Sequence, residues 1–452
     1  MNDNIFFPVR WEEKTKMFLN YTIISIIFLL YSFSLAETNN SISSISVIIT
    51  IFYFIVSDIK YNLPFLVGLS VYESVFRWGK LSIWFILLLL YVVKLTIVNL
   101  NKNIDLRILA VGLSLLIIEL LNDLINVSMG QLFINLTIII FLTFFISYAN
   151  YIACSRFDIL FSLAVSFMTA MFYIVKSSGG FKKYIDNFMD ASAYALRFGH
   201  EYGETIGGAM AIPLYAALII AFSVTLFLSG IKLNIFEKVF LAVSLIVAVV
   251  FGSFTISRSF YLCLIAIVLM FFLARAKAKY KILILICVAV FLMVLYHNYY
   301  DIVNKIFNDL SLRVNNDSTM TGGRSEIWRS GLDYLSEHPM VLLFGKGATR
   351  YQTMAAEKGY LFSAGMHNLV LDIVMSWGIV GLVLVVSLMT ELFKKVNIKC
   401  GKLLLICFIP LITYLTFSLT ALRTVNMKTW TFLLATILFT KISDNGDLKN
   451  DT

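Results

Sequence analysis

The feature that most restricts the fold of this chain is a series of apolar runs that continues along almost its whole length. About 20 apolar residues cross a bilayer as one α-helix, and fewer suffice where a helix is surrounded by others. Applied to the 452 residues, this rule predicts about fourteen spans. They lie near residues 18–36, 41–57, 62–76, 81–98, 106–121, 129–148, 158–176, 206–230, 239–256, 260–274, 282–297, 367–389, 403–421 and 427–441. The first run has no small-residue cleavage pattern, so we interpret it as a span and not as a removable signal peptide.

The composition favours a membrane protein over a soluble one. Hydrophobic residues make up 60% of the sequence and charged residues 14%, whereas soluble domains contain about 45–50% and about 25%. A soluble core of this length would not hold so much apolar surface. We therefore predict an all-α fold, a polytopic transmembrane bundle of about 12–14 helices with a large, partly helical outer loop.

Short basic connections indicate the orientation of the bundle, because Lys and Arg are enriched on the cytoplasmic side. The clearest are 275–281 and 394–402, and connections near Lys102 and Lys238 fall on the same side. This topology accounts for the net charge of +9 without a nucleic-acid surface. Two large polar loops then face the periplasm or cell exterior. The predicted units are 1–176 (N-terminal helices), 177–205 (outer loop), 206–297 (central helices), 298–366 (large outer loop), 367–441 (C-terminal helices) and 442–452 (cytoplasmic tail).

Several kinds of site are missing from the sequence. It has no Gly-x-x-x-x-Gly-Lys-Ser/Thr phosphate loop. Neither outer loop contains an Asp-x-Asp pair, and the four histidines lack the spacing of metal ligands. We therefore expect neither a bound metal nor another cofactor.

The longer outer loop contains a predicted helix between Thr321 and Pro339. Residues at positions i, i+4, i+7 and i+11 of a helix share one stripe. In this helix they are Arg324, Trp328, Gly331 and Leu335. Arg324 should thus face the membrane-embedded body, where a buried guanidinium needs an anionic partner. The N–H groups of Gly322 and Gly323 at the helix start would favour a phosphate there, and the alternative partner is an acidic side chain.

Two further residues stand at the outer ends of predicted spans. Arg258 costs about 2.5–3.5 kcal/mol at the bilayer centre and less near the interface. An anionic ligand on the outer face explains its position, and the alternative is an interfacial anchor. His367 begins the span after the long loop, where it could accept a proton from an attacking hydroxyl. Its alternative role is that of an interfacial polar residue bonded to a neighbour.

Arg197 and His200 lie in the shorter outer loop, in a glycine-rich segment before the next span. Glycines there indicate a close-packed or strained backbone. Taken alone, Arg197 is equally well interpreted as a solvated loop residue.

Four features of the second half of the chain form a characteristic series. They are Arg197 with Gly208 after ten intervening residues, Ser257-Arg258-Ser259 at a span end, Gly323-Arg324 with Ile327-Trp328 and His338-Pro339, and Gly345-Lys346-Gly347 with His367-Asn368 and Gly378-x-x-Gly381. In this order they resemble the motifs of Wzy-type O-antigen and capsular polysaccharide polymerases and of the related O-antigen ligases. The resemblance covers about Arg197 to Met389. The long loop departs from it in having no second Arg-x10-Gly spacing, since Leu335 stands eleven positions after Arg324.

The resemblance implies a fold similar to GT-C type glycosyltransferases and a metal-independent glycosyl transfer. Its donor would be a glycan on undecaprenyl diphosphate, at the outer face of the bacterial inner membrane. The main prediction is polymerisation of lipid-linked oligosaccharide repeat units into O-antigen or capsular polysaccharide. The alternatives are ligation of finished glycan to lipid A core or protein and, from another class, transport of the lipid-linked oligosaccharide. A flippase and a chain-length regulator are the protein partners that it implies.

The resemblance also implies roles for individual residues. Arg258 and Arg324 would hold the diphosphate, whose negative charge grows as it leaves. His367 would be the base or would orient the acceptor, with Glu326, on the other side of the same helix, as a less favoured base. The residues expected to bind substrate are Arg197, His200, Trp328 and Arg329.

Overall fold

The computed structural model of the chain describes residues 6–37, 40–72, 77–78, 81–102, 104–123, 129–152, 154–190, 211–229, 233–273, 282, 293, 300–315, 324–396, 404–421 and 427–440. These residues are almost entirely helical. The extended segments among them form one short antiparallel pair, β1 (Arg77–Trp78) and β2 (Leu81–Ser82). The predicted all-α, polytopic class is therefore confirmed.

The first half of the chain forms helices with short connections between them. They are α1 (Phe6–Glu37), α2 (Asn40–Val56), α3 (Ile59–Leu69), the 3₁₀ helix η1 (Ser70–Tyr72), α4 (Ile83–Val98), α5 (Leu106–Asp123), α6 (Met129–Ser147), the 3₁₀ helix η2 (Ala149–Tyr151) and α7 (Arg156–Ser177). The start of α7 shows why these helices begin where they do. The Ser155 hydroxyl accepts the Asp158 N–H at 3.0 Å, and the Asp158 carboxylate accepts the Ser155 N–H at 3.3 Å. Both N–H groups would otherwise lack a partner in the first turn.

The second half adds more bundle helices and a group of shorter ones. They are α8 (Phe181–Asp190), α9 (Ala211–Leu228), α10 (Ile235–Phe254), α11 (Arg258–Leu273), α13 (Tyr300–Asn315), α14 (Arg324–Glu337), α15 (Pro339–Phe344), α16 (Arg350–Lys358), the 3₁₀ helix η3 (Leu361–Ala364), α17 (Leu369–Val396), α18 (Leu404–Cys407), α19 (Ile409–Ala421) and α20 (Met427–Thr440). All predicted spans coincide with described helices except 282–297, most of which lies outside the described residues. Among the described residues, five helices are long and apolar enough to cross a membrane: α1, α7, α9, α10 and α17.

The two predicted outer loops contain more helix than we expected. The shorter contains α8, and the longer contains α13, α15, α16 and η3 besides the predicted helix, which is confirmed as α14. Isolated helices this short are marginal in water, so tertiary packing must stabilise them. In α8, for example, the buried side chains are Tyr184 and Phe188, four residues apart on one face.

Burial divides the bundle into a protein-packed centre and a lipid-facing exterior. The central helices α7 and α9 pack against each other, and 83% of the most apolar window of each is buried. In α10 the corresponding share is 22%, although its window is as apolar as that of α9. Exposed apolar side chains on such a helix are stable only in a lipid environment, so α10 lies at the rim of the bundle.

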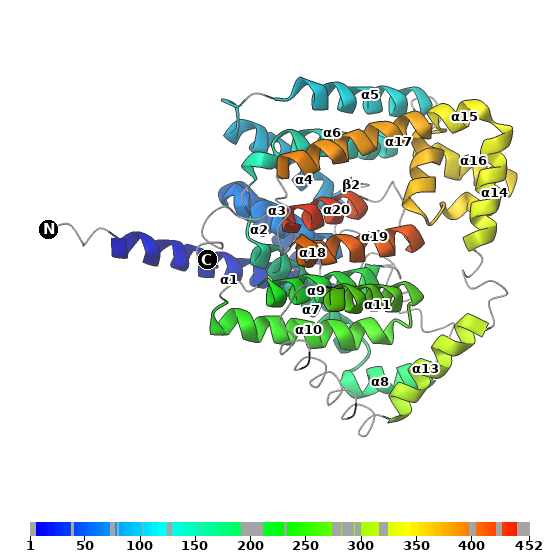
Figure 1. Cartoon of the computed structure of the whole chain (residues 1–452). Helices are drawn as coiled ribbons and strands as arrows, with labels where there is room; N and C mark the ends of the chain where they lie inside the picture. Colours follow the sequence, from blue (N-terminus) through cyan, green and yellow to red (C-terminus); the bar gives the residue numbers. More distant parts are fainter. Residues whose placement is uncertain are drawn as a thin grey trace.

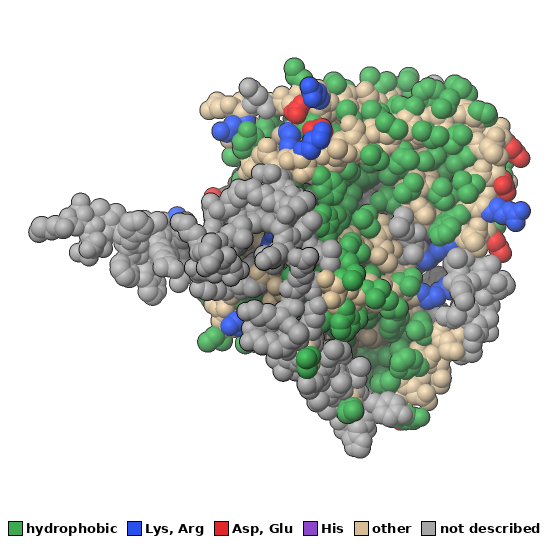
Figure 2. All heavy atoms as spheres, in the orientation of Figure 1, with side chains coloured by type: hydrophobic (Ala, Val, Ile, Leu, Met, Phe, Trp, Pro, Cys, Tyr) green, Lys and Arg blue, Asp and Glu red, His purple; other side chains and the backbone are tan. Residues whose placement is uncertain are grey.

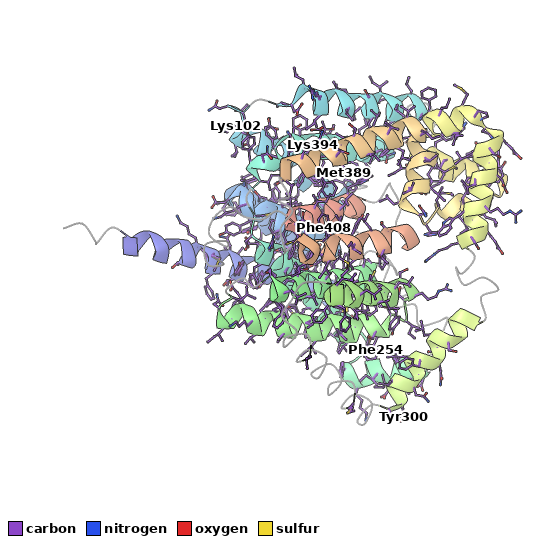
Figure 3. All side chains as sticks on the ribbon, in the orientation of Figure 1. Lys102, Phe254, Tyr300, Met389, Lys394 and Phe408 are labelled. Atoms are coloured by element: carbon purple, nitrogen blue, oxygen red, sulfur yellow. The ribbon has the colours of Figure 1, made fainter. Side chains whose placement is uncertain are left out.

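Two basic segments, the connection before α5 and the end of α17, meet at one end of the bundle. Lys395 at the end of α17 donates to the Ser147 carbonyl at 2.8 Å and lies 4.0 Å from the Asp105 carboxylate. Lys102 and Lys394 lie at this same end in Figure 3. Helices α14, α15 and α16 lie at the opposite end, where α14 runs across the ends of the bundle helices (Figure 1).

Candidate active site

Residues 324–366, which we call the outer lobe, form a small domain with its own hydrophobic cluster. The buried members are Tyr334, Leu335, Val341, Tyr351, Ala355, Phe362, Met366, Val374 and Met375. Val374 and Met375 belong to α17, so this bundle helix forms one side of the cluster. The cluster therefore packs the lobe against the bundle.

The stripe of α14 predicted to face the bundle does pack inward. Gly331 and Leu335 are buried, and the Trp328 indole N–H donates to the Met366 carbonyl at 2.8 Å. A Cβ at Gly331 would overlap the methyl end of the Met366 side chain, so the two residues are in close contact. Arg324 is the first residue of α14 and lies one turn before Trp328 on the same stripe.

His367 follows Met366 directly and has a left-handed backbone with φ 51°. Its other neighbour, Asn368, caps α17: the amide oxygen accepts the N–H groups of Val370 at 3.0 Å and Leu371 at 3.2 Å. The predicted position of His367 at the start of a span is thus correct to two residues. In the chain, His367 thus stands between a residue bonded to α14 and a residue bonded to α17.

Asp372 was not singled out from the sequence, yet it organises this corner of the lobe. It is fully buried, and its Oδ1 accepts the Tyr351 hydroxyl and the Met366 N–H, the latter at 3.2 Å. Met366 is therefore bonded at both its N–H and its carbonyl. An ionisable residue inside a predicted span was the available signal, because such residues are usually functional.

Arg258 begins α11, directly after the connection from α10 in which Ile256 has φ 47°. The end of α10 and the start of α11 point toward the end of the bundle that bears the outer lobe (Figure 1). Figure 2 shows separate Lys and Arg side chains at this end, near the ends of α11 and α19 and beside α14, with Asp and Glu side chains along α14. This end of the molecule thus carries charges of both signs.

Arg329 and Glu326 lie on the face of α14 opposite to Arg324. They line an open groove of about 350 Å³, together with Ser330, Asp333, Tyr334, Glu337, Tyr360 and Leu361. Arg329 thus lies on a different face of α14 from Trp328, with which the sequence analysis groups it as substrate-binding. The predicted site residues Arg197 and His200 lie outside the described residues.

The lobe is joined to the bundle at a break in α17. Gly378 has a non-helical backbone with φ 72°, which interrupts the helix. The N–H groups of Lys346 and Gly347 donate to the carbonyls of Met375 and Ser376, each at 2.9 Å. Non-helical backbone at membrane depth is stable only where protein satisfies its polar groups, and the 346–347 segment does so.

A buried polar cluster reinforces this joint from the side of α5. The Glu119 carboxyl accepts the Trp377 indole N–H at 2.7 Å and the Ala348 N–H at 3.4 Å. The Asn135 amide on α6 donates to Glu119 at 2.6 Å and to Asp123 at 3.0 Å. Both carboxyl groups are fully buried. The first half of the chain thus contributes bonds to both sides of this joint, at Ala348 and at Trp377.

The arrangement joins α14, which begins with Arg324, to the segment that bears His367. The contact between Trp328 and Met366 places the stripe of Arg324 beside the segment that bears His367. An arginine and a histidine can bind an anion and accept a proton at neighbouring positions. Within the described parts of the chain, no group of three or more His, Cys, Asp or Glu side chains is arranged to hold a metal ion.

Comparison with known proteins bears on the second half of the chain. Residues 240–386 match a family model described as O-antigen ligase. This range contains Arg258, Arg324 and His367 but not Arg197 or His200. A search of curated proteins found no match. The match supports the superfamily of O-antigen polymerases and ligases that the motifs resemble, and it does not separate its polymerases from its ligases.

Proposed function

We propose that this chain polymerises oligosaccharide repeat units carried on undecaprenyl diphosphate into O-antigen or capsular polysaccharide. The observation that supports this most is the contact of the Trp328 indole with the Met366 carbonyl at 2.8 Å, because it joins the helix that begins with Arg324 to the residue before His367. Both residues, with Arg258, fall within the range matched by the O-antigen ligase family model.

The proposed reaction requires no group beyond these side chains and the activated donor. A hydroxyl oxygen of the acceptor sugar attacks the anomeric carbon of the donor glycan. The new carbon–oxygen bond forms as the bond to the phosphate oxygen breaks, and the lipid diphosphate leaves with the bonding electrons. His367 accepts the hydroxyl proton, while Arg258 and Arg324 stabilise the charge that develops on the diphosphate.

The location of the lobe suits two lipid-linked substrates. Their diphosphates lie at the headgroup level of the bilayer, and their sugars extend into water. We assign the end of the bundle with the outer lobe to the periplasmic face, since the basic connection at Lys102 and the basic end of α17 lie at the other end. Arg197 and His200 remain proposed contacts to phosphate or acceptor.

Ligation is the second candidate, and one observation favours it: the matched family model is described as O-antigen ligase. The two activities share the donor and differ in the acceptor. Glycan profiling of a deletion strain complemented by this chain separates them. A strain that accumulates a single repeat unit on its final carrier lacks a polymerase, whereas a strain with no attached glycan lacks a ligase.

The direct test uses the purified full chain in detergent with undecaprenyl-diphosphate-linked repeat units from the same cells. Growth of a glycan ladder without another protein supports polymerisation. Binding of the lipid-linked units without growth would contradict it and would favour transport.

Within this assay, Arg324→Ala should reduce chain growth by at least about 100-fold, because a fixed donor to the developing charge is lost. Arg324→Lys should restore little, since an ammonium lacks the bidentate fork. The matched control is Lys394→Ala, which removes an exposed cation from the far end of α17. Chain growth near the wild-type rate in Arg324→Ala would remove this residue from the site.

A further inference from the structure

We infer that Asp372 is a positioning residue that fixes the imidazole of His367 through the backbone of Met366. The inference rests on the proposed function in so far as His367 accepts the hydroxyl proton. Asp372 lies five positions after His367, one turn into α17, and its carboxylate reaches back to the segment before the histidine.

The geometry leaves the Met366 peptide groups little freedom. Asp372 on α17 accepts the Met366 N–H at 3.2 Å, and Trp328 on α14 donates to the Met366 carbonyl at 2.8 Å. The Met366 side chain is fully buried and packs against Gly331. A residue held at its N–H, its carbonyl and its side chain determines where the next residue begins.

His367 needs such support because of its own backbone. A left-handed conformation costs a non-glycine residue about 1–2 kcal/mol, and it persists only where the surroundings enforce it. With φ 51°, His367 has this conformation. If the Met366 N–H were released, the segment could relax to an extended backbone and the imidazole would turn away.

Tyr351 completes the support from a third element. Its hydroxyl donates to the same carboxylate oxygen that accepts the Met366 N–H. The Tyr351 hydroxyl also accepts from the Gln352 side chain at 3.2 Å. Since Asp372 is fully buried, it acts through these bonds and does not itself touch the substrate.

Two variants separate the acceptor role of Asp372 from the branched shape of its side chain. Asp372→Asn keeps a side-chain oxygen that can accept the Met366 N–H. Asp372→Leu keeps the same number and branching of heavy atoms, in a bulkier side chain, and removes the acceptor. We expect Asp372→Asn to keep the His367 imidazole largely fixed and Asp372→Leu to let it move.

The first readout does not depend on glycosyl transfer. Diethyl pyrocarbonate modifies the histidines of the full chain in detergent, and mass spectrometry gives the rate for each one. We expect Asp372→Leu to raise the rate at His367 several-fold and Asp372→Asn to leave it near wild type. His338, whose Nδ1 lies 2.9 Å from the Tyr334 carbonyl oxygen, is the internal reference in the same lobe. An unchanged rate at His367 in the Leu variant overturns the inference, and so does equal acceleration at His338, which would mean a loosened lobe.

The second readout is the rate of chain growth. A displacement of about 1 Å at a reacting group costs about 100-fold, so we expect a loss of this order for Asp372→Leu and partial recovery for Asp372→Asn. If labelling behaves as expected but the wild-type chain extends no lipid-linked unit, the proposed function fails and the positioning of His367 by Asp372 stands.

Discussion

The transmembrane bundle and the outer lobe both bury polar side chains, but the bundle satisfies many more of them within single helices. In the bundle, Ser46, Thr225 and Thr413 each donate to the carbonyl four residues earlier on their own helix, at 2.7–2.8 Å. The bundle also has bonds between distant segments, such as that of the Tyr21 hydroxyl to Asp158 at 2.6 Å. In the lobe and its joint, the bonded partners are 21 residues apart for Tyr351 and Asp372 and 258 apart for Trp377 and Glu119.

This difference shows where each region obtains its shape. A bond within one helix forms wherever the helix forms, so it adds little to the choice of tertiary structure. A bond between distant segments exists in one arrangement alone. The lobe, which has a small hydrophobic cluster, therefore depends more on individual contacts than the bundle does.

The largest effect should come from the glycines at the break in α17. Gly345 (φ 77°) lies against the backbone of Ser376 and Trp377. Gly378 (φ 72°) lies against the backbone before Gly345, where an added Cβ would overlap the Leu343 carbonyl. Gly378→Ala should therefore lower the free energy of unfolding by about 3 kcal/mol or more. The measurement is thermal unfolding of the purified chain in detergent.

Gly359→Ala is the matched control for this change. Gly359 also has a left-handed backbone, with φ 71°, but nothing lies within 4 Å of an added Cβ. Its substitution should cost only the backbone strain, about 1–2 kcal/mol. Equal losses of unfolding free energy in the two variants would mean that the close contact between α15 and α17 does not stabilise the chain.

An intermediate effect is expected at the polar cluster on α5 and α6. Asn135→Leu would leave the buried oxygens of Glu119 and Asp123 without the amide that now serves both. A loss of about 2–4 kcal/mol should follow, because buried acceptors left without a donor are costly. Ser46→Ala, which removes a bond within one helix, should cost less than about 1 kcal/mol. Similar losses in both variants would contradict the contrast between bonds within one helix and bonds between segments.

The same contrast explains what could be predicted from the sequence. The spans follow from the length of apolar runs, and the inward stripe of α14 follows from the spacing of Trp328, Gly331 and Leu335. Asp372 and Glu119 could not be assigned partners, because one sequence does not tell which distant segments meet. The break at Gly378 escaped prediction for a related reason, since the N–H groups that satisfy it come from residues 346 and 347.

The smallest effect concerns a cation of the lobe. Burial lowers the pKa of the Lys346 ammonium, and the nearby charges of Arg350 and Lys358 lower it further. Between this lowered pKa and the ordinary lysine value of 10.5, the unfolded chain binds more protons, so stability rises with pH across that window. Lys346→Gln should therefore raise the melting temperature slightly near pH 7, and the gain should vanish as pH approaches the ordinary value.

Lys394→Gln provides the comparison at the other end of α17. The Lys394 ammonium lies 2.6 Å from the Glu391 carboxylate and is exposed, so its loss should not stabilise the chain at any pH. A Lys346→Gln variant that is more stable but slower in chain growth would show that like charges persist in the lobe at a cost to stability. Such a cost is typical of sites that bind an anionic substrate. If Lys346→Gln were no more stable than wild type near pH 7, the charge of Lys346 would not lower the stability of the chain, as we expect for Lys394.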